Sequence, residues 1–151
     1  IYLQQAPIQT LHALMNGWRT GSFVPYPDLP QWYGEYPWSF TLIPEWKSLS
    51  AKSLAEICFT QYKACHTQCI DSLSKLSSAQ VYVLDINLWQ EDPSASGEKL
   101  FRFLKRPRPK NTLRLELLPI QSPHQMQNAI ELQSISNKIN KYHINSVVTF
   151  R

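Results

Sequence analysis

Apolar and polar residues alternate in several short stretches of the chain, which is the pattern of a half-buried β-strand. Residues 81–89 give the clearest alternation, and residues 112–120 repeat it. Two weaker stretches, residues 38–43 and 144–150, also have strand-like composition. The positions expected to share one face are Tyr82, Leu84, Ile86 and Leu88 in the first stretch, and Leu113, Leu115 and Leu117 in the second.

Other stretches repeat their apolar residues every three or four positions, as an amphipathic helix does. The first such stretch covers residues 50–76, where Ser53 and Glu56 fit a capping box. The second covers residues 122–140, with Ser122 as its expected N-cap and Pro123 in its first turn. The expected buried positions are Leu54, Cys58, Tyr62, Cys65, Cys69, Leu73 and Leu76 in the first helix, and Ala129, Leu132, Ile135 and Ile139 in the second.

Residues 98–106 decide between two fold classes. As a helix, they complete the order β-α-β-α-β-α-β, which favours an α/β fold with a mostly parallel sheet flanked by helices, as in RecA-like and Rossmann-like domains. As a strand, they favour a ferredoxin-like α+β fold. The sequence predicts the α/β fold and keeps the α+β fold as its alternative.

Residues 1–38 differ from the rest of the chain, which we expect to be a single domain over residues 39–151. Half of the aromatic residues lie between Trp18 and Trp46, together with five of the eleven prolines. Proline breaks helices and favours extended backbone, so we expect an extended arm. Its aromatic side chains can cover the domain's own core, bind a partner protein or stack on nucleic-acid bases. The residues expected to bind a partner are Trp18, Tyr26, Trp32, Tyr33, Tyr36 and Trp38.

The stretch LIPEWKSLSAKSLAEI, residues 42–57, resembles the phosphate-binding loop of RecA-like P-loop domains, whose pattern is G-x-x-x-x-G-K-[ST]. Lys52 and Ser53 match that pattern, whereas Trp46 and Ala51 stand in the places of its two glycines. Those glycines let the backbone approach a phosphate closely. The resemblance therefore implies a degenerate P-loop domain, and we expect no nucleotide cofactor.

Composition narrows the class of protein. No apolar run reaches the length of a membrane-spanning helix, and three cysteines are too few and odd in number for a disulfide scaffold. We therefore expect an intracellular protein of the cytoplasm or nucleus without a membrane association.

Candidate catalytic and metal-binding residues are few. Cys58, Cys65 and Cys69 lie in the apolar stripe of the first helix, so we expect packing and no metal site. Asp85 and Glu116 are the acidic residues of the two clearest strands. Should those strands be neighbours, the two carboxylates could hold Mg²⁺ as in a metal-dependent nuclease. No other constellation indicates an enzyme.

Positive charge is concentrated in one short stretch. The formal net charge of the chain is +4, yet seven of its fifteen Lys and Arg lie within sixteen residues that hold no Asp or Glu. Pro107 and Pro109 favour an extended backbone there. Exposed cations of this kind suit contacts to phosphate. The residues expected to bind DNA or RNA are Lys99, Arg102, Lys105, Arg106, Arg108, Lys110 and Arg114.

These features predict a non-catalytic subunit of a nucleic-acid-handling complex, such as one acting in DNA repair or recombination. The arm and helices would contact protein subunits, and the basic stretch would contact phosphate. A protein-binding scaffold with no nucleic-acid role is the first alternative, and the nuclease is the second.

Overall fold

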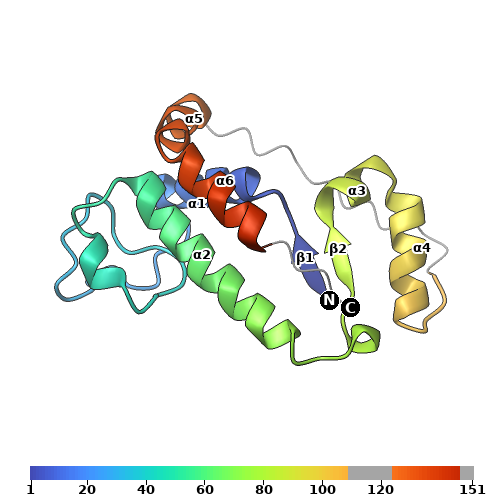
Figure 1. Ribbon diagram of the computed structural model, residues 1–151. Coiled ribbons are helices and arrows are strands. Elements are labelled where there is room, and N and C mark those ends of the chain that lie inside the picture. Colours follow the sequence, from blue (N-terminus) through green and yellow to red (C-terminus); the bar gives the residue numbers. More distant parts are fainter. Residues whose placement is uncertain (109–123, 147–151) are drawn as a thin grey trace. The chain divides into compact units, whose positions relative to one another are not determined.

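The computed structural model describes residues 1–108 and 124–146, and it is mostly helical (Figure 1). Of the described residues, 59% lie in helices and 6% in strands. Six α-helices accompany a single parallel sheet of two strands within this part of the chain. The expected α/β fold is therefore wrong. The ferredoxin-like alternative, which needs a larger antiparallel sheet, does not describe these residues either.

Two compact units make up the chain. Of the described residues, 7–70 and 124–146 form the helical core unit, and 1–6 and 71–108 form the sheet unit. Nearly all buried apolar side chains belong to a cluster in the helical core unit.

Helix α1, Pro7–Thr20, begins the helical core unit, so the expected extended arm is wrong for these residues. Pro7 occupies the first turn, where its missing N–H removes no hydrogen bond. Leu11, Met15 and Trp18 repeat at helical spacing and are buried. The helix ends at Gly21, whose φ of 61° suits glycine. The prolines that suggested an extended arm begin only at Pro25.

Helix α2, Leu54–Leu73, confirms the first expected helix with a later start. The hydroxyl of Ser53 accepts a hydrogen bond from the backbone N–H of Glu56, 3.3 Å away, so Ser53 caps the helix. A short 3₁₀ helix, η1 (Trp46–Leu49), precedes it. Only the first two turns of α2 are buried, at Leu54, Ala55, Ile57, Cys58 and Gln61.

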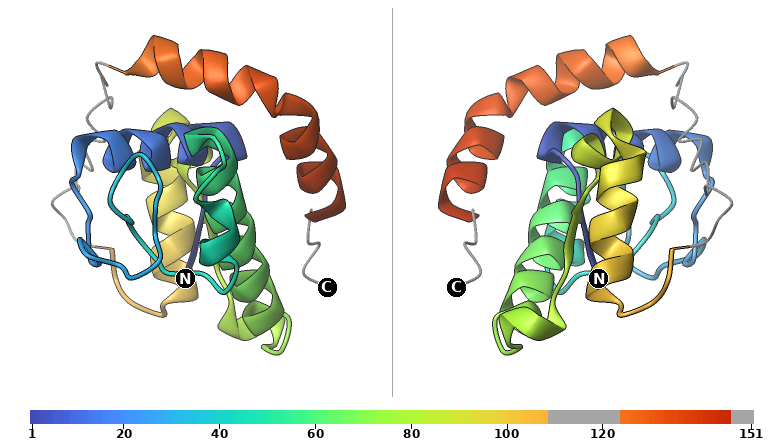
Figure 2. Two further views of the ribbon diagram at one scale, coloured as in Figure 1. Left: turned by 90° about the vertical axis from the view of Figure 1, so that its left-hand side faces the viewer. Right: turned by 90° about the vertical axis from the view of Figure 1, so that its right-hand side faces the viewer.

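The expected C-terminal helix forms as two shorter ones, α5 (Gln125–Ser134) and α6 (Ser136–Ser146), which meet at an angle (Figure 2). The hydroxyl of Ser134 donates to the carbonyl of Glu131 at 2.7 Å, a side-chain bond of the kind that bends or ends helices. Leu132, Ile135 and Ile139 are buried as expected. Asn128 is buried in place of Ala129, which is exposed.

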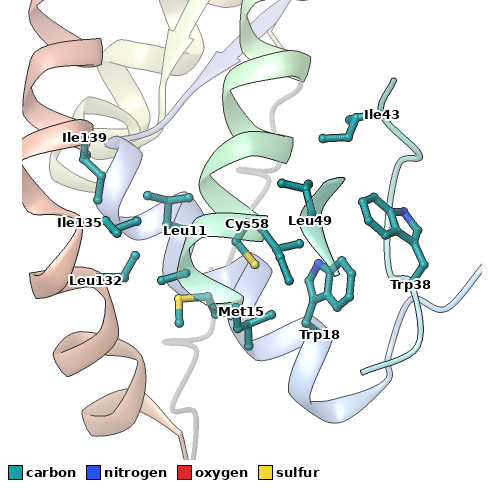
Figure 3. Packing of buried hydrophobic residues seen from close by; sticks show 13 residues of the cluster. Leu11, Met15, Trp18, Trp38, Ile43, Leu49, Cys58, Leu132, Ile135 and Ile139 are labelled. Carbon is teal, nitrogen blue, oxygen red and sulfur yellow. The ribbon is translucent and has the colours of Figure 1, made fainter. Parts of the chain in front are cut away.

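The core of this unit forms where α1, α2, α5, α6 and the segment 21–49 meet (Figure 3). Leu132, Ile135 and Ile139 extend from α5 and α6 toward Leu11 on α1. Trp38 lies on the other side of the cluster, beside Trp18. The rings of these two tryptophans are 5.3 Å apart in an edge-to-face arrangement. Residues 21–49, the proline-rich segment, are thus an integral part of this core.

The sheet unit contains β1 (Tyr2–Gln4) and β2 (Val83–Asp85), which pair in parallel with Leu3 opposite Leu84 (Figure 1). Helices α3 (Ile86–Glu91) and α4 (Pro93–Phe103) follow β2. A short 3₁₀ helix, η2 (Ser78–Gln80), precedes β2. The helical alternative for residues 98–106 is therefore confirmed as far as Phe103.

Most of the expected strands are wrong. Residues 38–43 contain only an isolated bridge between Tyr26 and Trp38. Residues 81–89 keep three residues of strand, because the carboxylate of Asp85 accepts hydrogen bonds from the backbone of Asn87 and Leu88 and starts α3. Residues 144–146 belong to α6, and the rest of 144–150 and all of 112–120 lie outside the described residues.

Candidate functional site

Five of the seven predicted phosphate-binding residues form one exposed group on α4 and the segment that follows it. We name this group the α4 basic surface; its members are Lys99, Arg102, Lys105, Arg106 and Arg108. All five side chains are exposed. Lys110 and Arg114 lie outside the described residues.

A well-defined turn at the end of α4 fixes the backbone of this surface. The N–H of Lys105 donates to the carbonyl of Arg102, and the N–H of Arg106 donates to that of Phe101, each at 3.1 Å. This pair of hydrogen bonds is a Schellman motif. Lys105 takes the left-handed position with a φ of 51°, where glycine is usual. A lysine therefore occupies a position that favours glycine.

The helix terminus also favours positive charge. The last carbonyls of α4 give its C-terminal end a partial negative charge, which stabilises nearby cations. Arg102 and Lys105 lie in and just beyond the last turn. The end of α4 therefore favours the positive charges of Arg102 and Lys105.

Partners of these cations are few. Arg102 forms an exposed ion pair with Glu98, 2.8 Å away and one turn earlier. Arg108 donates to the carbonyl and hydroxyl oxygens of Ser94, at 3.3 and 3.1 Å. These bonds join the end of the α4 basic surface back to the start of α4. Within residues 1–108 and 124–146, Lys99, Lys105 and Arg106 have no ion pair.

The residues of the nuclease hypothesis are not brought together in the described part of the chain. Asp85 uses its carboxylate to cap α3, at 2.8 Å from the N–H of Asn87, and Glu116 lies outside the described residues. Over the described ranges, no group of three His, Cys, Asp or Glu is placed to hold a metal ion.

The segment that resembles a P-loop has a different local structure. Trp46 starts η1, and Lys52 donates its N–H to the carbonyl of Leu49 at 2.9 Å. The side chain of Lys52 is exposed. Ser53 is the N-cap of α2. The strand expected before this loop, residues 38–43, is irregular.

The six predicted partner-binding aromatics divide by exposure. Trp18 and Trp38 are buried, and Trp32 and Tyr36 are partly buried against the same core. Tyr26 and Tyr33 are exposed, at 41% and 82%. Of the six, only these last two are exposed to solvent.

The buried indoles share one polar centre. The amide of Gln61 accepts a hydrogen bond from Trp18 Nε1 at 3.0 Å and donates to the carbonyls of Ser39 and Thr41, each at 2.8 Å. The amide therefore satisfies polar groups of α1 and the proline-rich segment within the core. The hydrophobic periodicity of the helix does not predict that Gln61 is buried, because a polar residue is normally expected on the surface.

A second polar centre lies around Arg19, whose side chain is 4% exposed. Its guanidinium donates to Asn128 Oδ1 at 2.9 Å and to the hydroxyl of Tyr36 at 2.8 Å, and it pairs with Glu131. Burial, followed by a hydrogen bond to Glu35, raises the pKa of Tyr36, while the nearby Arg19 lowers it. Arg19 of α1 therefore joins Tyr36 to α5.

The three cysteines do not share one buried stripe, so that part of the packing prediction is wrong. Cys58 is buried, and burial raises the pKa of its thiol far above the usual range. Cys65 and Cys69 are exposed. Partial burial also raises the pKa of Cys65.

The sequence reasoning missed an open groove on the helical core unit. It is lined by Phe23, Val24, Pro25, Tyr26, Phe40, Thr41 and Leu42 and has a volume of about 610 Å³. In the sequence, residues 23–26 contain two aromatic residues and a proline, which fit the expected arm and do not by themselves indicate a groove.

The described helices include none that is both long enough and apolar enough to span a membrane. The chain matches no family model, no curated protein and no solved structure.

Proposed function

We propose that this chain is a non-catalytic subunit of a nucleic-acid-handling assembly and that its α4 basic surface binds the phosphate backbone. The observation that carries the proposal is the exposure of five cations within ten residues, four of them without an ion pair in the described part of the chain. When such cations bind a nucleic acid, they release the counterions condensed on its phosphates, and this release favours the complex.

The local structure supports phosphate contact without reading of bases. Lys99 and Arg102 lie on α4 and the other three cations follow its end, and no aromatic residue occurs from Leu104 to Arg108 for stacking on a base. Contacts of this kind add affinity and position a protein but carry no sequence information. We therefore expect binding that is similar for all sequences and strongly dependent on salt.

The test compares two triple variants of the whole chain. The first changes Lys99, Lys105 and Arg106 to Gln, and the control changes Lys63, Lys75 and Lys141, which are exposed elsewhere. Each variant removes three positive charges, taking the formal net charge from +4 to +1. Fluorescence anisotropy measures the affinity for a labelled oligonucleotide at several salt concentrations.

The first variant should reduce the slope of log affinity against log salt by about 2.7 on duplex DNA, or about 2.1 on a single strand. The control should leave the slope close to that of the unchanged chain. Equal slopes for the two variants would show that net charge, and not the α4 basic surface, governs binding.

A second candidate function is a protein scaffold, and the exposed face of α5 favours it. Met126 and Ile130 lie one turn apart and are 80% and 68% exposed. Exposed apolar side chains on one helical face are typical of protein contacts. A chain that binds no oligonucleotide at low salt, yet keeps its fold, would favour this function.

A further inference from the structure

We propose that the groove on the helical core unit binds an extended, proline-containing basic segment of a partner protein. The groove is the one lined by Phe23, Val24, Pro25, Tyr26, Phe40, Thr41 and Leu42. This inference does not depend on the proposed nucleic-acid function, because the α4 basic surface belongs to the other unit.

The backbone of the groove is held by a close pairing of two segments. The N–H of Phe40 donates to the carbonyl of Phe23 at 2.8 Å, and Tyr26 forms an antiparallel bridge with Trp38. Trp38 is buried in the core, and its indole N–H donates to the carbonyl of Thr41 at 3.3 Å. The groove is therefore fixed in place by the core beneath it.

Phe40 has an unusual conformation at the centre of this groove. Its φ is 61°, a left-handed backbone that is rare for a bulky residue. Its ring packs so closely on α1 that a Cβ at Gly17 would lie 2.3 Å from Phe40 Cζ. Strained residues of this kind cluster at binding sites, where the surrounding structure maintains them.

The ring of Phe40 packs on α1 and also stacks with the exposed ring of Phe23. The rings of Phe23 and Phe40 are stacked with centroids 5.1 Å apart. Phe23 is 60% exposed, although it is apolar, and Tyr26 is exposed beside it. Grooves lined with aromatic rings bind polyproline II segments, because proline rings pack between them and the ligand is already extended.

Charge determines which extended segment fits. Residues 20–46, which carry the whole groove, contain Asp28, Glu35 and Glu45 and no Lys, Arg or His. All three acidic side chains are exposed. Of the two cations that flank this range, Arg19 has a buried side chain that pairs with Glu131, while Lys47 is exposed and lies over the ring of Trp46. The three acidic side chains attract a basic ligand and repel a polyanion. A basic, proline-containing peptide therefore suits this surface better than nucleic acid does.

The experiment measures binding of a labelled peptide of alternating Arg and Pro to the full chain by fluorescence anisotropy. Peptides of alternating Gln and Pro, Glu and Pro, and Arg and Ala serve as comparisons. We expect the Arg-Pro peptide to bind most tightly and to weaken as salt rises, since exposed charges are screened. Equal binding by any comparison peptide, or displacement by a single-stranded oligonucleotide, would overturn the proposal.

Variants locate the binding surface. Phe23→Ala and Tyr26→Ala should each weaken Arg-Pro binding about tenfold, as loss of a central aromatic contact does. Tyr33→Ala is the matched control, because Tyr33 is more exposed than either and does not line the groove. Changing Asp28, Glu35 and Glu45 together to Asn and Gln should remove most of the salt dependence.

The fold is checked on the same samples by circular dichroism. Tyr26→Ala removes an exposed side chain and keeps the backbone bridge to Trp38, so this variant should stay folded. If Phe23→Ala unfolds, Tyr26→Ala alone tests whether the peptide binds in the groove. Full binding by a folded Tyr26→Ala chain would place the peptide elsewhere and overturn the proposal.

Discussion

The indole of Trp18 donates its Nε1 hydrogen to the side-chain oxygen of Gln61, 3.0 Å away in the core. This contact joins α1 to α2 across 43 residues of sequence. The same amide donates to the carbonyls of Ser39 and Thr41, so one side chain hydrogen-bonds three polar groups, two of them in fully buried contacts.

Gln61→Leu should therefore lower the free energy of unfolding by about 2–4 kcal/mol, because it leaves an indole N–H and two carbonyls without these partners in the core. Lys63→Met is the control, since it makes a polar-to-apolar change at an exposed position of the same helix. Urea denaturation followed by tryptophan fluorescence measures both. A similar loss in the two variants would show that the Gln61 amide has no special role.

Arg19 gives a second test of a buried polar contact. Arg19→Met should cost about 3 kcal/mol, because it leaves the Glu131 carboxylate and two other polar groups without their donor. Arg19→Lys should restore little, since an ammonium cannot reproduce the planar fork of the guanidinium. Arg102→Met, which breaks an exposed pair with Glu98, should cost under about 0.5 kcal/mol. Equal losses for Arg19→Met and Arg102→Met, by urea denaturation, would contradict the buried network.

Lys105 tests the turn at the end of α4. Lys105→Gly should stabilise the sheet unit by about 1 kcal/mol, since glycine adopts the left-handed conformation without the strain of a side chain. Lys99→Gly, within α4, should destabilise it by about the same amount. Thermal denaturation shows whether each variant is more or less stable than the unchanged chain. A loss of stability in both variants would mean that Lys105 is not in the left-handed position.

The pKa of His66 is lowered, first by partial burial and then by the nearby charge of His143. The Nδ1 atom of His66 lies 2.8 Å from the hydroxyl of Tyr142 on α6. Between the lowered pKa and the ordinary value of about 6.5, the unfolded chain binds a proton that the folded chain does not. Stability should therefore fall as the pH drops through this window.

His66→Gln removes this titration. The free energy of unfolding of the variant should therefore decline less between pH 7.5 and pH 5 than that of the unchanged chain, and the difference should match the uptake of a proton at one site. Urea denaturation at a series of pH values provides the comparison. Parallel declines in the two proteins would assign the pH dependence to other groups.

The cysteines should differ in their reaction with iodoacetamide. Only thiolate reacts, and the buried Cys58 has a raised pKa and no access to the reagent. Cys65 and Cys69 are exposed and should both be labelled in the folded chain. Mass spectrometry of the peptides should show Cys58 modified only after unfolding. Early modification of Cys58 would contradict the packing of α2 on α1.

The sequence alone determined the helices that carry strong local signals. The helix over residues 54–73 was predictable because Ser53 and Glu56 mark its start and because its apolar residues recur every three or four positions. The exposure of the basic stretch was predictable for the same local reason, since five consecutive residues from Leu104 to Arg108 contain three cations and a proline.

Tertiary structure decided the elements for which local patterns conflict. Residues 81–89 alternate as a strand does, yet the Asp85 carboxylate starts α3 there and Trp89 is buried beside α4. The proline-rich segment gave no sign that Trp18 and Trp38 pack together or that Gln61 lies beneath them. Burial depends on residues distant in sequence, and periodicity records only near neighbours. For that reason the packing of the tryptophans, the groove and the strained Phe40 became visible only in three dimensions.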